Sequence, residues 1–527
     1  MSAFQNGFHV THLSFVLLLG SLLCPTGAKA ESTPTKTGSS PNIVYILCDD
    51  LGYGDVHTLN PERGKIATPK MDTLASQGMI FTDAHSGSSV CSPTRYGIMT
   101  GRYAWRTKLQ SGVLNGYSTP LIAPGRTTVA SFLKSHGYAT ACIGKWHIGM
   151  EMTPKTGGKK NEIDYALPIK NGPVDVGFDY YYGISASLDM PPYVFIENNK
   201  FTELPTVEKK WIRQGPAAKS FEAIDVLPTL KSKAVQFVKD HATDAKGGKP
   251  FFMYVPLNSP HTPILPSAEW KGKSGLGDYG DFVMQTDDAI GQIVESVDQS
   301  GLKESTLIIV TSDNGCSPAA KVDDLEKQGH FPSAQFRGYK ADIWEGGHRI
   351  PFIARWTGKI AEHSSYQHTV CLTDLFATAA ELVNDKPPAN AAEDSVSILP
   401  ALLGKTAPLR EATVHHSIQG HFAIRMGEWK LELTPGSGGW GSPTTPQAIS
   451  QKLPAMQLYN MQSDISEKEN LSGKNADKVA ALKAMLEKYV AQGRSTPGEK
   501  QANDVEIKLI KAKVGAATDA EVKAKGD

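Results

Sequence analysis

Asn42-Ile43-Val44-Tyr45-Ile46-Leu47 is a short, nearly continuous apolar run near the start of the chain. A strand that is covered by helices on both faces of a sheet has this composition. Apolar runs of the same kind follow at residues 138–143, 251–255 and 306–310, and a helical pattern at 281–299 separates the last two. This alternation predicts an α/β fold with a large mixed, mostly parallel sheet flanked by helices.

Polar side chains follow two of these predicted strands. Asp49-Asp50 come just after the first run, and Asp313-Asn314 come just after the last. Ligands of such sheets gather beyond the carboxyl ends of the strands, so we expect one shared site. Carboxylate and amide oxygens suit Ca²⁺ or Mg²⁺. For either pair alone the alternative is turn formation, because Asp, Asn and Gly are favoured in turns.

The most distinctive motif is Cys91-Ser92-Pro93-Thr94-Arg95, which is followed by Gly101-Arg102 and has the pattern C-x-P-x-R…G-R. Three further stretches accompany it: Gly144-Lys145-Trp146-His147, Pro260-His261-Thr262-Pro263 and Gly338-Tyr339-Lys340-Ala341-Asp342-Ile343-Trp344-Glu345-Gly346-Gly347. In this order they resemble the motifs of the type I sulfatases, in which the cysteine is oxidised to formylglycine. The resemblance covers residues 42 to about 360 and implies the alkaline-phosphatase-like fold.

The resemblance also implies two cofactors, a divalent cation and the formylglycine made from Cys91. The cation is expected to be Ca²⁺, with Mg²⁺ as the alternative. The implied metal ligands are Asp49, Asp50, Asp313, Asn314 and an oxygen of the modified Cys91.

Six further residues receive roles from the same resemblance. Arg95 is expected to steady the hydrated formylglycine, while Lys145 and Lys340 bind sulfate oxygens. His147 is expected to take the proton that lets sulfate leave, and His261 to face the leaving oxygen and bind substrate. Ser187 stands where some relatives carry a serine near the sulfate, so it is a further candidate for substrate binding.

These residue types fit the chemistry of a sulfate ester without reference to a family. The ester is an anion, and its reaction develops charge on the leaving oxygen, which a divalent cation and lysine side chains can compensate. A positioned histidine that protonates the leaving oxygen contributes roughly 10²–10⁴-fold. Taken singly, a lysine is more often a solvated surface charge and a buried cysteine an inert hydrophobe. Their joint occurrence favours an active site.

Composition and the N-terminus limit the class of protein. The 527 residues contain 54 Lys+Arg and 54 Asp+Glu, so no basic excess argues for a nucleic-acid partner. An apolar run at residues 13–23 that precedes Ala28-Lys29-Ala30 predicts a signal peptide at 1–30 and a secreted or periplasmic protein. The run is short for a bilayer span, so we expect no stable membrane anchor.

Changes in composition and hydrophobic pattern along the rest of the chain predict its domain organisation. We expect a flexible lead-in at 31–41, a catalytic domain at 42–405, a C-terminal subdomain with an antiparallel sheet and a helix at 406–495, and a charged tail at 496–527. Among the cysteines, Cys48 and Cys142 lie in apolar runs and are expected to be buried thiols. The pairing of Cys316 and Cys371 stays open.

The sequence thus predicts an exported sulfatase with a sulfated carbohydrate as substrate and a formylglycine-generating enzyme as partner. A galactose-type ring sulfated at O6 is the expected substrate, with contacts from His415, His416, Ser417, His421, Arg425 and the loop through Trp440. One alternative is a phosphonate monoester or phosphodiester hydrolase, because fold alone does not decide the reaction. The other alternative is an inactive binder of sulfated glycans.

Overall fold

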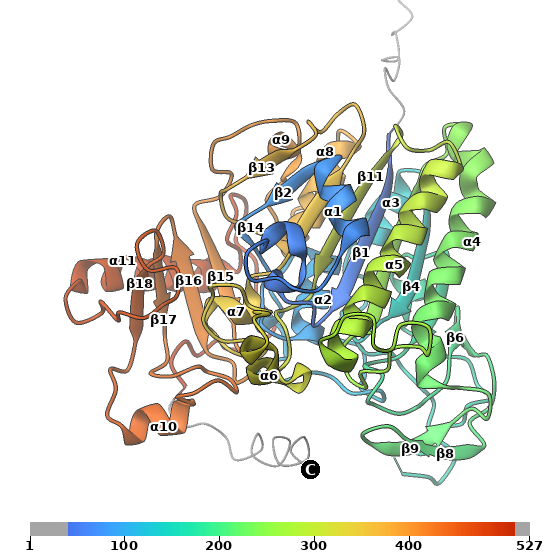
Figure 1. Cartoon of the computed structure of the whole chain (residues 1–527), viewed down its shortest axis with the longest axis horizontal. Coiled ribbons are helices and arrows are strands. Elements are labelled where there is room, and N and C mark those ends of the chain that lie inside the picture. Colours follow the sequence, from blue (N-terminus) through green and yellow to red (C-terminus); the bar gives the residue numbers. More distant parts are fainter. Residues whose placement is uncertain (1–39, 160, 512–527) are drawn as a thin grey trace, which may run out of the picture. The chain divides into compact units, whose positions relative to one another are not determined.

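The computed structural model describes residues 40–159 and 161–511, and a large sheet runs through this part of the chain (Figure 1). The predicted signal peptide, most of the lead-in and the end of the predicted tail lie outside the described residues. The main sheet has ten strands in the order β13-β2-β12-β11-β1-β10-β4-β5-β6-β7. These strands are β1 Asn42–Asp49, β2 Met79–Phe81, β4 Ala139–Lys145, β5 Tyr180–Ile184, β6 Ile196–Glu197, β7 Lys200–Phe201, β10 Phe251–Pro260, β11 Thr306–Ser312, β12 Phe352–Arg355 and β13 Ser364–Tyr366.

The remaining elements surround this sheet or form smaller ones. The other strands are β3 Ala84–His85, β8 Val207–Lys210, β9 Gln214–Ala217, β14 Val370–Cys371, β15 Ala412–His416, β16 Phe422–Met426, β17 Trp429–Glu432 and β18 Gln457–Asn460. The helices are α1 Pro69–Ser76, α2 Cys91–Thr100, α3 Val129–Ser135, α4 Val226–Lys246, α5 Gly277–Gln299, α6 Val322–Lys327, α7 Glu345–His348, α8 Leu375–Leu382, α9 Leu399–Leu402, α10 Thr445–Ser450 and α11 Ala476–Gln492.

The centre of the main sheet is parallel, as predicted. Strand β1 pairs in parallel with β10 on one side and with β11 on the other. Its side chains alternate between two cores: Val44 and Ile46 join the core beneath α4 and α5, while Tyr45 and Leu47 join the core beneath α3 and α8. Burial on both faces explains the continuous apolar run. Antiparallel pairs occur toward the two edges, where β12 pairs with β11 and β6 with β5, so the sheet is mixed.

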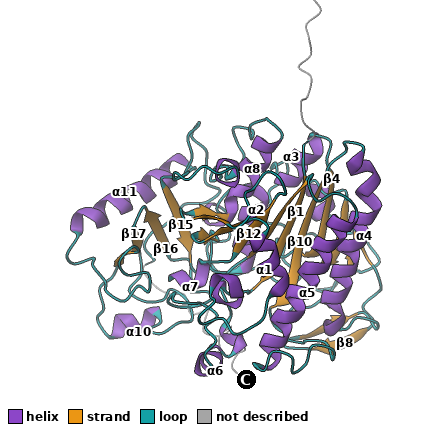
Figure 2. Ribbon diagram, turned by 45° about the horizontal axis from the view of Figure 1, so that its top comes forward, coloured by secondary structure: helices purple, strands orange, loops and turns teal. Residues whose placement is uncertain are grey.

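Helices cover both faces of the sheet in Figure 2, with α4 and α5 on one face and α3 and α8 on the other. The 23-residue α5 contains the predicted helical pattern, and Val283, Ile290 and Ile293 are its fully buried stripe. The α/β prediction with a mostly parallel sheet is confirmed.

A second, four-stranded sheet has the order β15-β16-β17-β18 and is antiparallel throughout. Leu482, Leu486 and Tyr489 of α11 pack into the core of this sheet. The predicted C-terminal α+β element is therefore present, while its exact domain boundaries stay a prediction. The described part of the predicted tail, 496–511, contains no helix, and Asp504 in it pairs with the buried Arg102.

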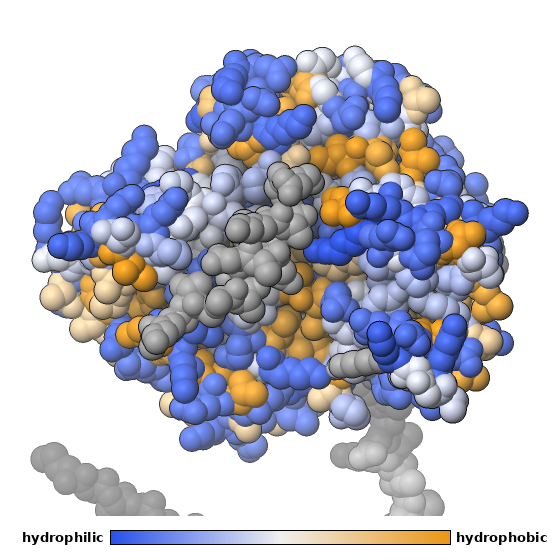
Figure 3. Space-filling view, turned by 90° about the horizontal axis from the view of Figure 1, so that it is seen from below, coloured by the Kyte–Doolittle hydropathy of each residue, from blue (hydrophilic) through white to orange (hydrophobic). Residues whose placement is uncertain are grey.

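Two further expectations concern cysteines and membranes. All five cysteines within the described residues, Cys316 and Cys371 included, are buried free thiols. Within residues 40–159 and 161–511, no helix has both the length and the apolar character of a bilayer span. The face shown in Figure 3 is mostly hydrophilic with scattered apolar patches.

Candidate active site

Two neighbouring parallel strands deliver the predicted metal ligands. Cys48 of β1 lies opposite Ser312 of β11, so Asp49-Asp50 and Asp313-Asn314 emerge at the same edge of the sheet. The Asp50 amide donates to Asp313 Oδ1 at 3.2 Å, which ties the two strand ends together. Asp50 has a φ of 65°, a left-handed turn that redirects the chain directly after Asp49.

The side chains at this edge converge on one point. One ligand atom from each of Asp49, Asp50, Cys91 and His261 lies within 4.8 Å of the others, and all four residues are buried. Within the described part of the chain, Asp49 Oδ1 and Asn314 Oδ1 are buried and have no hydrogen-bond partner. Bare, converging carboxylate and amide oxygens are the donor set of a hard divalent cation, so the residues present fit Ca²⁺ or Mg²⁺.

Cys91 is the first residue of α2 and is buried beside this cluster. Burial raises the pKa of its thiol to about 11, although Lys145 and Lys340 oppose the shift. Unmodified Cys91 is therefore a protonated thiol at neutral pH and a weak nucleophile.

Arg95 lies one helical turn after Cys91 and is fully buried. Its Nε and Nη2 donate to Asp313 Oδ2 at 2.9 and 2.7 Å, and its Nη1 donates to the Lys145 carbonyl at 2.9 Å. This fork holds α2, β4 and the end of β11 in one arrangement.

Two lysines bring positive charge to the aspartates, one to each carboxylate. Lys145, the last residue of β4, places Nζ 2.7 Å from Asp49 Oδ2. Lys340 places Nζ 2.7 Å from Asp50 Oδ1. Burial alone would raise the pKa of Asp49 and Asp50, but the lysines and His261 outweigh it and lower both pKa values. Both carboxylates are thus ionised and able to serve as ligands.

The two candidate histidines have different hydrogen bonds. His147 Nε2 lies 2.7 Å from the Leu114 carbonyl, so this nitrogen carries the proton and donates. Its Nδ1 is buried and has no hydrogen-bond partner among the described residues. Burial, Lys145 and Arg95 hold the pKa of His147 well below its usual value, so Nδ1 is a bare base. His261 lies 2.7 Å from the Thr262 carbonyl through Nδ1, and its Nε2 faces Asp50 Oδ2 at 3.6 Å.

Ser187 is placed by β5, which pairs with β4 so that Ile184 lies opposite Lys145. Its Oγ is buried and forms no hydrogen bond within the described chain. The same holds for both side-chain polar atoms of Asn258, near the end of β10. Asn258 was not predicted from the sequence; the available signal was a polar residue within an apolar strand, three positions before His261.

The predicted sugar contacts divide into two groups. His415 stacks on His348, and Arg425 pairs with Asp83, so both belong to the packing of the C-terminal sheet against its neighbours. In contrast, the predicted Ser417 lies in a segment that reaches Lys340, because the amide of the next residue, Ile418, donates to the Ala341 carbonyl at 3.1 Å.

The loop through Trp440 also reaches the Lys340 segment. The amides of Trp440 and Gly441 donate to Asp342 Oδ1 at 2.9 and 2.8 Å. The C-terminal part of the chain therefore adjoins Lys340, the lysine predicted to bind sulfate.

Comparisons with known proteins agree with this arrangement. The family model described as Sulfatase matches residues 41–385. The N-acetylgalactosamine-6-O-sulfatase of Bacteroides thetaiotaomicron is 32% identical over 89% of this chain and 96% of its own length. Arylsulfatase A of Bos taurus is 31% identical over 85% of this chain and 86% of its own length.

Solved structures show the same likeness. A sulfatase structure from work on the metabolism of multiple glycosaminoglycans by Bacteroides thetaiotaomicron has a TM-score of 0.74 and 31% identity, covering 86% of this chain and 99% of that one. A crystal structure in complex with a neocarrahexaose has a TM-score of 0.66 and 25% identity, covering 88% and 95%.

Proposed function

Because the chain belongs to the sulfatase family and is a hydrolase of sulfate esters, we propose that it removes 6-O-sulfate groups from galactose-type sugars of sulfated glycans. The proposed nucleophile is formylglycine made from Cys91, the proposed cation is Ca²⁺, and the proposed place of action is outside the cytoplasm. The observation that carries the proposal is the convergence of Asp49, Asp50, Cys91 and His261 within 4.8 Å.

The oxygen donors support Ca²⁺ as the cofactor. Asp49, Asp50, Asp313 and Asn314 would hold it, and it would supply positive charge to the sulfate and to the developing negative charge. Lys145 and Lys340 flank the same carboxylates, so they would bind the remaining sulfate oxygens. The anionic substrate is thus met by charges already fixed in a buried site.

Formylglycine at position 91 requires a two-electron oxidation of the cysteine. The thiol carbon gains one oxygen, sulfur leaves as hydrogen sulfide, and the electrons pass to the oxidant of a formylglycine-generating enzyme. The hydrated aldehyde supplies a nucleophilic hydroxyl and a second hydroxyl whose deprotonation expels sulfate. The raised pKa of the Cys91 thiol supports the need for this conversion.

His147 and His261 would divide the proton transfers. The bare, buried Nδ1 of His147 would accept the proton of the second hydroxyl, because Nε2 is committed to the Leu114 carbonyl. His261 would give a proton to the leaving sugar oxygen from Nε2 in its imidazolium form, because Nδ1 donates to the Thr262 carbonyl and the neutral ring carries no proton on Nε2. Arg95 would hold α2, and with it residue 91, in register with Asp313.

The proposed sugar is inferred from the names of relatives and from the loops beside Lys340. Two sets of relatives are named for the 6-sulfate of N-acetylgalactosamine, the bacterial protein at 32% identity and the Mus musculus protein at 28%. The contacts of Ile418 and Trp440 with the Lys340 segment support a C-terminal wall of the sugar pocket. Export is supported by the signal pattern of residues 1–30.

The test uses the full chain made together with a formylglycine-generating enzyme. Mass spectrometry of the Cys91 peptide should show a loss of about 18 Da, which follows from exchange of the thiol for an aldehyde. Sulfate release is then compared on three sugars: 6-O-sulfated N-acetylgalactosamine, its 4-O-sulfated isomer and 6-O-sulfated N-acetylglucosamine.

The expected order has the first sugar fastest, by at least about tenfold in kcat/KM. Cys91→Ser, which keeps a polar side chain of similar size, is the matched control and should be inactive. A converted enzyme that prefers the 4-O-sulfate or the glucosamine contradicts the sugar assignment. Activity of Cys91→Ser equal to that of the natural chain contradicts the nucleophile.

A further inference from the structure

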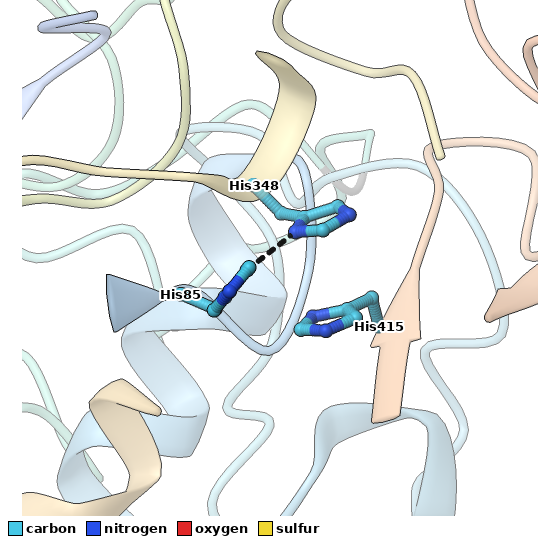
Figure 4. A group of neighbouring side chains, drawn as sticks. All are labelled: His85, His348 and His415. Carbon is cyan, nitrogen blue, oxygen red and sulfur yellow. Dashed lines mark hydrogen bonds between the residues drawn. The ribbon is translucent and has the colours of Figure 1, made fainter. Parts of the chain in front are cut away.

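Three histidines that the proposed reaction does not use meet in the interior (Figure 4). His85 comes from β3, His348 from α7 and His415 from β15, and all three side chains are fully buried. One ring nitrogen of each lies within 4.8 Å of those of the others. The cluster joins segments separated by up to 330 positions in the chain.

Hydrogen bonds to carbonyl groups fix the tautomers of two rings. His348 Nε2 lies 3.0 Å from the Ile343 carbonyl, and His415 Nδ1 lies 3.2 Å from the Ser86 carbonyl. A carbonyl oxygen can only accept, so these two nitrogens carry the protons. In the neutral rings, His348 Nδ1 and His415 Nε2 are therefore bare.

The third ring is fixed by a carboxylate. His85 Nε2 lies 2.6 Å from Asp83 Oδ1. Asp83 is also paired with Arg349 and Arg425, and these cations outweigh burial and lower its pKa, so it is ionised and accepts. His85 Nε2 carries the proton, and His85 Nδ1 is bare in its turn.

The bare nitrogens face one another. His85 Nδ1 and His348 Nδ1 are 2.9 Å apart, the distance of a hydrogen bond for which neither neutral ring has a proton. His415 Nε2 is buried and has no hydrogen-bond partner among residues 40–159 and 161–511. Unshared lone pairs at this distance repel, so the arrangement calls for a cation between them.

We propose that His85 Nδ1, His348 Nδ1 and His415 Nε2 bind a divalent transition-metal ion of the zinc class. Neutral imidazole suits such ions, whereas Ca²⁺ and Mg²⁺ take oxygen ligands. Each ring is backed through its other nitrogen by Asp83 or by a carbonyl, the outer-shell arrangement typical of metal-bound histidine. A bound water would complete a four-coordinate site.

One rearrangement accompanies binding. The rings of His348 and His415 are stacked, with centroids 3.9 Å apart and planes at 5°, whereas a lone pair points along its ring plane. For all three nitrogens to bind one ion, the His415 ring must rotate so that it is no longer parallel to the His348 ring. The described hydrogen bond that opposes this motion is the 3.2 Å contact with Ser86.

The site would brace the active site from behind. β3 leads within six residues to Cys91, α7 begins five residues after Lys340, and β15 belongs to the C-terminal sheet. An ion on all three would join the two catalytic segments to that sheet. It is distinct from the oxygen cluster and takes part in no step of the proposed reaction.

The experiment uses the full, tag-free chain, loaded with Ca²⁺ to fill the oxygen cluster, after exposure to Zn²⁺ and removal of loosely bound metal. We expect about one zinc per chain, as for a single closed site. His415→Gln and His348→Gln should each lower retained zinc at least about tenfold, the effect expected for loss of one ligand. The matched control is His416→Gln, which removes the neighbouring imidazole of the same strand and should retain zinc.

Thermal unfolding gives a second reading. After chelation and reloading with Ca²⁺, which fills the oxygen cluster, Zn²⁺ should raise the Tm of the natural chain and of His416→Gln further, and His415→Gln should show no further rise. Absence of retained zinc together with absence of a zinc-dependent rise in the natural chain would overturn the proposal and leave a shared proton between His85 and His348.

A third measurement uses the natural chain alone, so its result does not depend on whether a variant folds. Co²⁺ bound by the chelated natural chain should give visible absorption typical of a nitrogen-ligated, four-coordinate ion, and Zn²⁺ should abolish it. Absence of that absorption, or zinc retention by His415→Gln equal to that of the natural chain, contradicts the site.

Discussion

Replacement of Arg95 by methionine should destabilise the protein in a pH-dependent way. The guanidinium provides both hydrogen bonds to Asp313 Oδ2 and one to the Lys145 carbonyl. Without it, the buried Asp313 either stays an unpaired anion or takes up a proton. Burial already raises the pKa of Asp313 to about 6, with Arg95 opposing that shift, so the variant's pKa must lie higher still.

The loss of folding free energy is estimated from the protonation of Asp313 and from the unpaired Lys145 carbonyl. Holding a proton on Asp313 at pH 7 costs about 1.4 kcal/mol relative to the ionised natural protein, because pH 7 is about one unit above a pKa of about 6. The unpaired Lys145 carbonyl adds about 1–3 kcal/mol. The loss is thus about 3 kcal/mol at pH 7. It grows as the pH rises, by at most about 1.4 kcal/mol per pH unit, as long as the folded variant binds this proton and the unfolded chain does not.

The assay is urea unfolding of the natural chain and of Arg95→Met between pH 6 and 9, with chelator present so that no cation compensates Asp313. The control is the double variant Arg95→Met/Asp313→Asn, whose amide cannot ionise. It should keep the pH-independent loss from the Lys145 carbonyl and lose the slope. A cost of Arg95→Met that stays constant from pH 6 to 9, or a double variant with the same slope, would refute the reasoning.

Three further outcomes are expected at the reaction centre. Chelation should lower hydrolysis of an aryl sulfate at least about 10²-fold, the scale of a lost electrostatic contact, and Ca²⁺ should restore the activity. Asn314→Leu removes a buried oxygen that has no other described partner, so it should raise the Ca²⁺ concentration needed for that restoration. An unchanged Ca²⁺ concentration contradicts the role of Asn314 as a ligand. His147→Gln should lower kcat roughly 10²–10⁴-fold and leave a sulfated enzyme that mass spectrometry of the intact chain shows about 98 Da above the aldehyde form, because the trapped diol carries one H₂O and one SO₃ more than the aldehyde. Burial, Lys145 and Arg95 lower the pKa of His147, so its imidazole stays neutral, and able to accept a proton, to a pH below its ordinary pKa of about 6.5. The acidic limb of the pH profile of kcat should therefore lie below about pH 6.5. An acidic limb centred above pH 7 is the contrary result.

The centre of the fold was predictable because its strands are buried on both faces. A run such as Ile43–Leu47 has no polar side to hide, so composition alone indicates its environment. The meeting of Asp49-Asp50 with Asp313-Asn314 was predictable for a related reason, since residues that follow adjacent parallel strands must meet at one edge. The antiparallel β12 beside β11 was not predictable, because the same apolar composition suits either direction.

Contacts between segments that are distant along the chain could not be predicted from the sequence. Nothing local distinguishes His85, His348 and His415 from separate core histidines, and only the fold brings them together. The charged segment after residue 495 looked like a tail, yet the buried Arg102 takes Asp504 from it at 3.0 Å. A buried guanidinium must find an anion, but the sequence does not identify which one.

Asp342 shows why substrate choice and rate should change together in this protein. Its Oδ1 accepts the amides of Trp440 and Gly441, and its Oδ2 accepts the amide of Tyr339, the residue before Lys340. One buried carboxylate thus fixes both the segment proposed to bind sulfate and the loop proposed to face the sugar. A change in that loop moves the backbone that carries Lys340, so it cannot alter sugar binding alone. Because contacts that position a charge act on the transition state, such changes should appear in kcat as well as in KM.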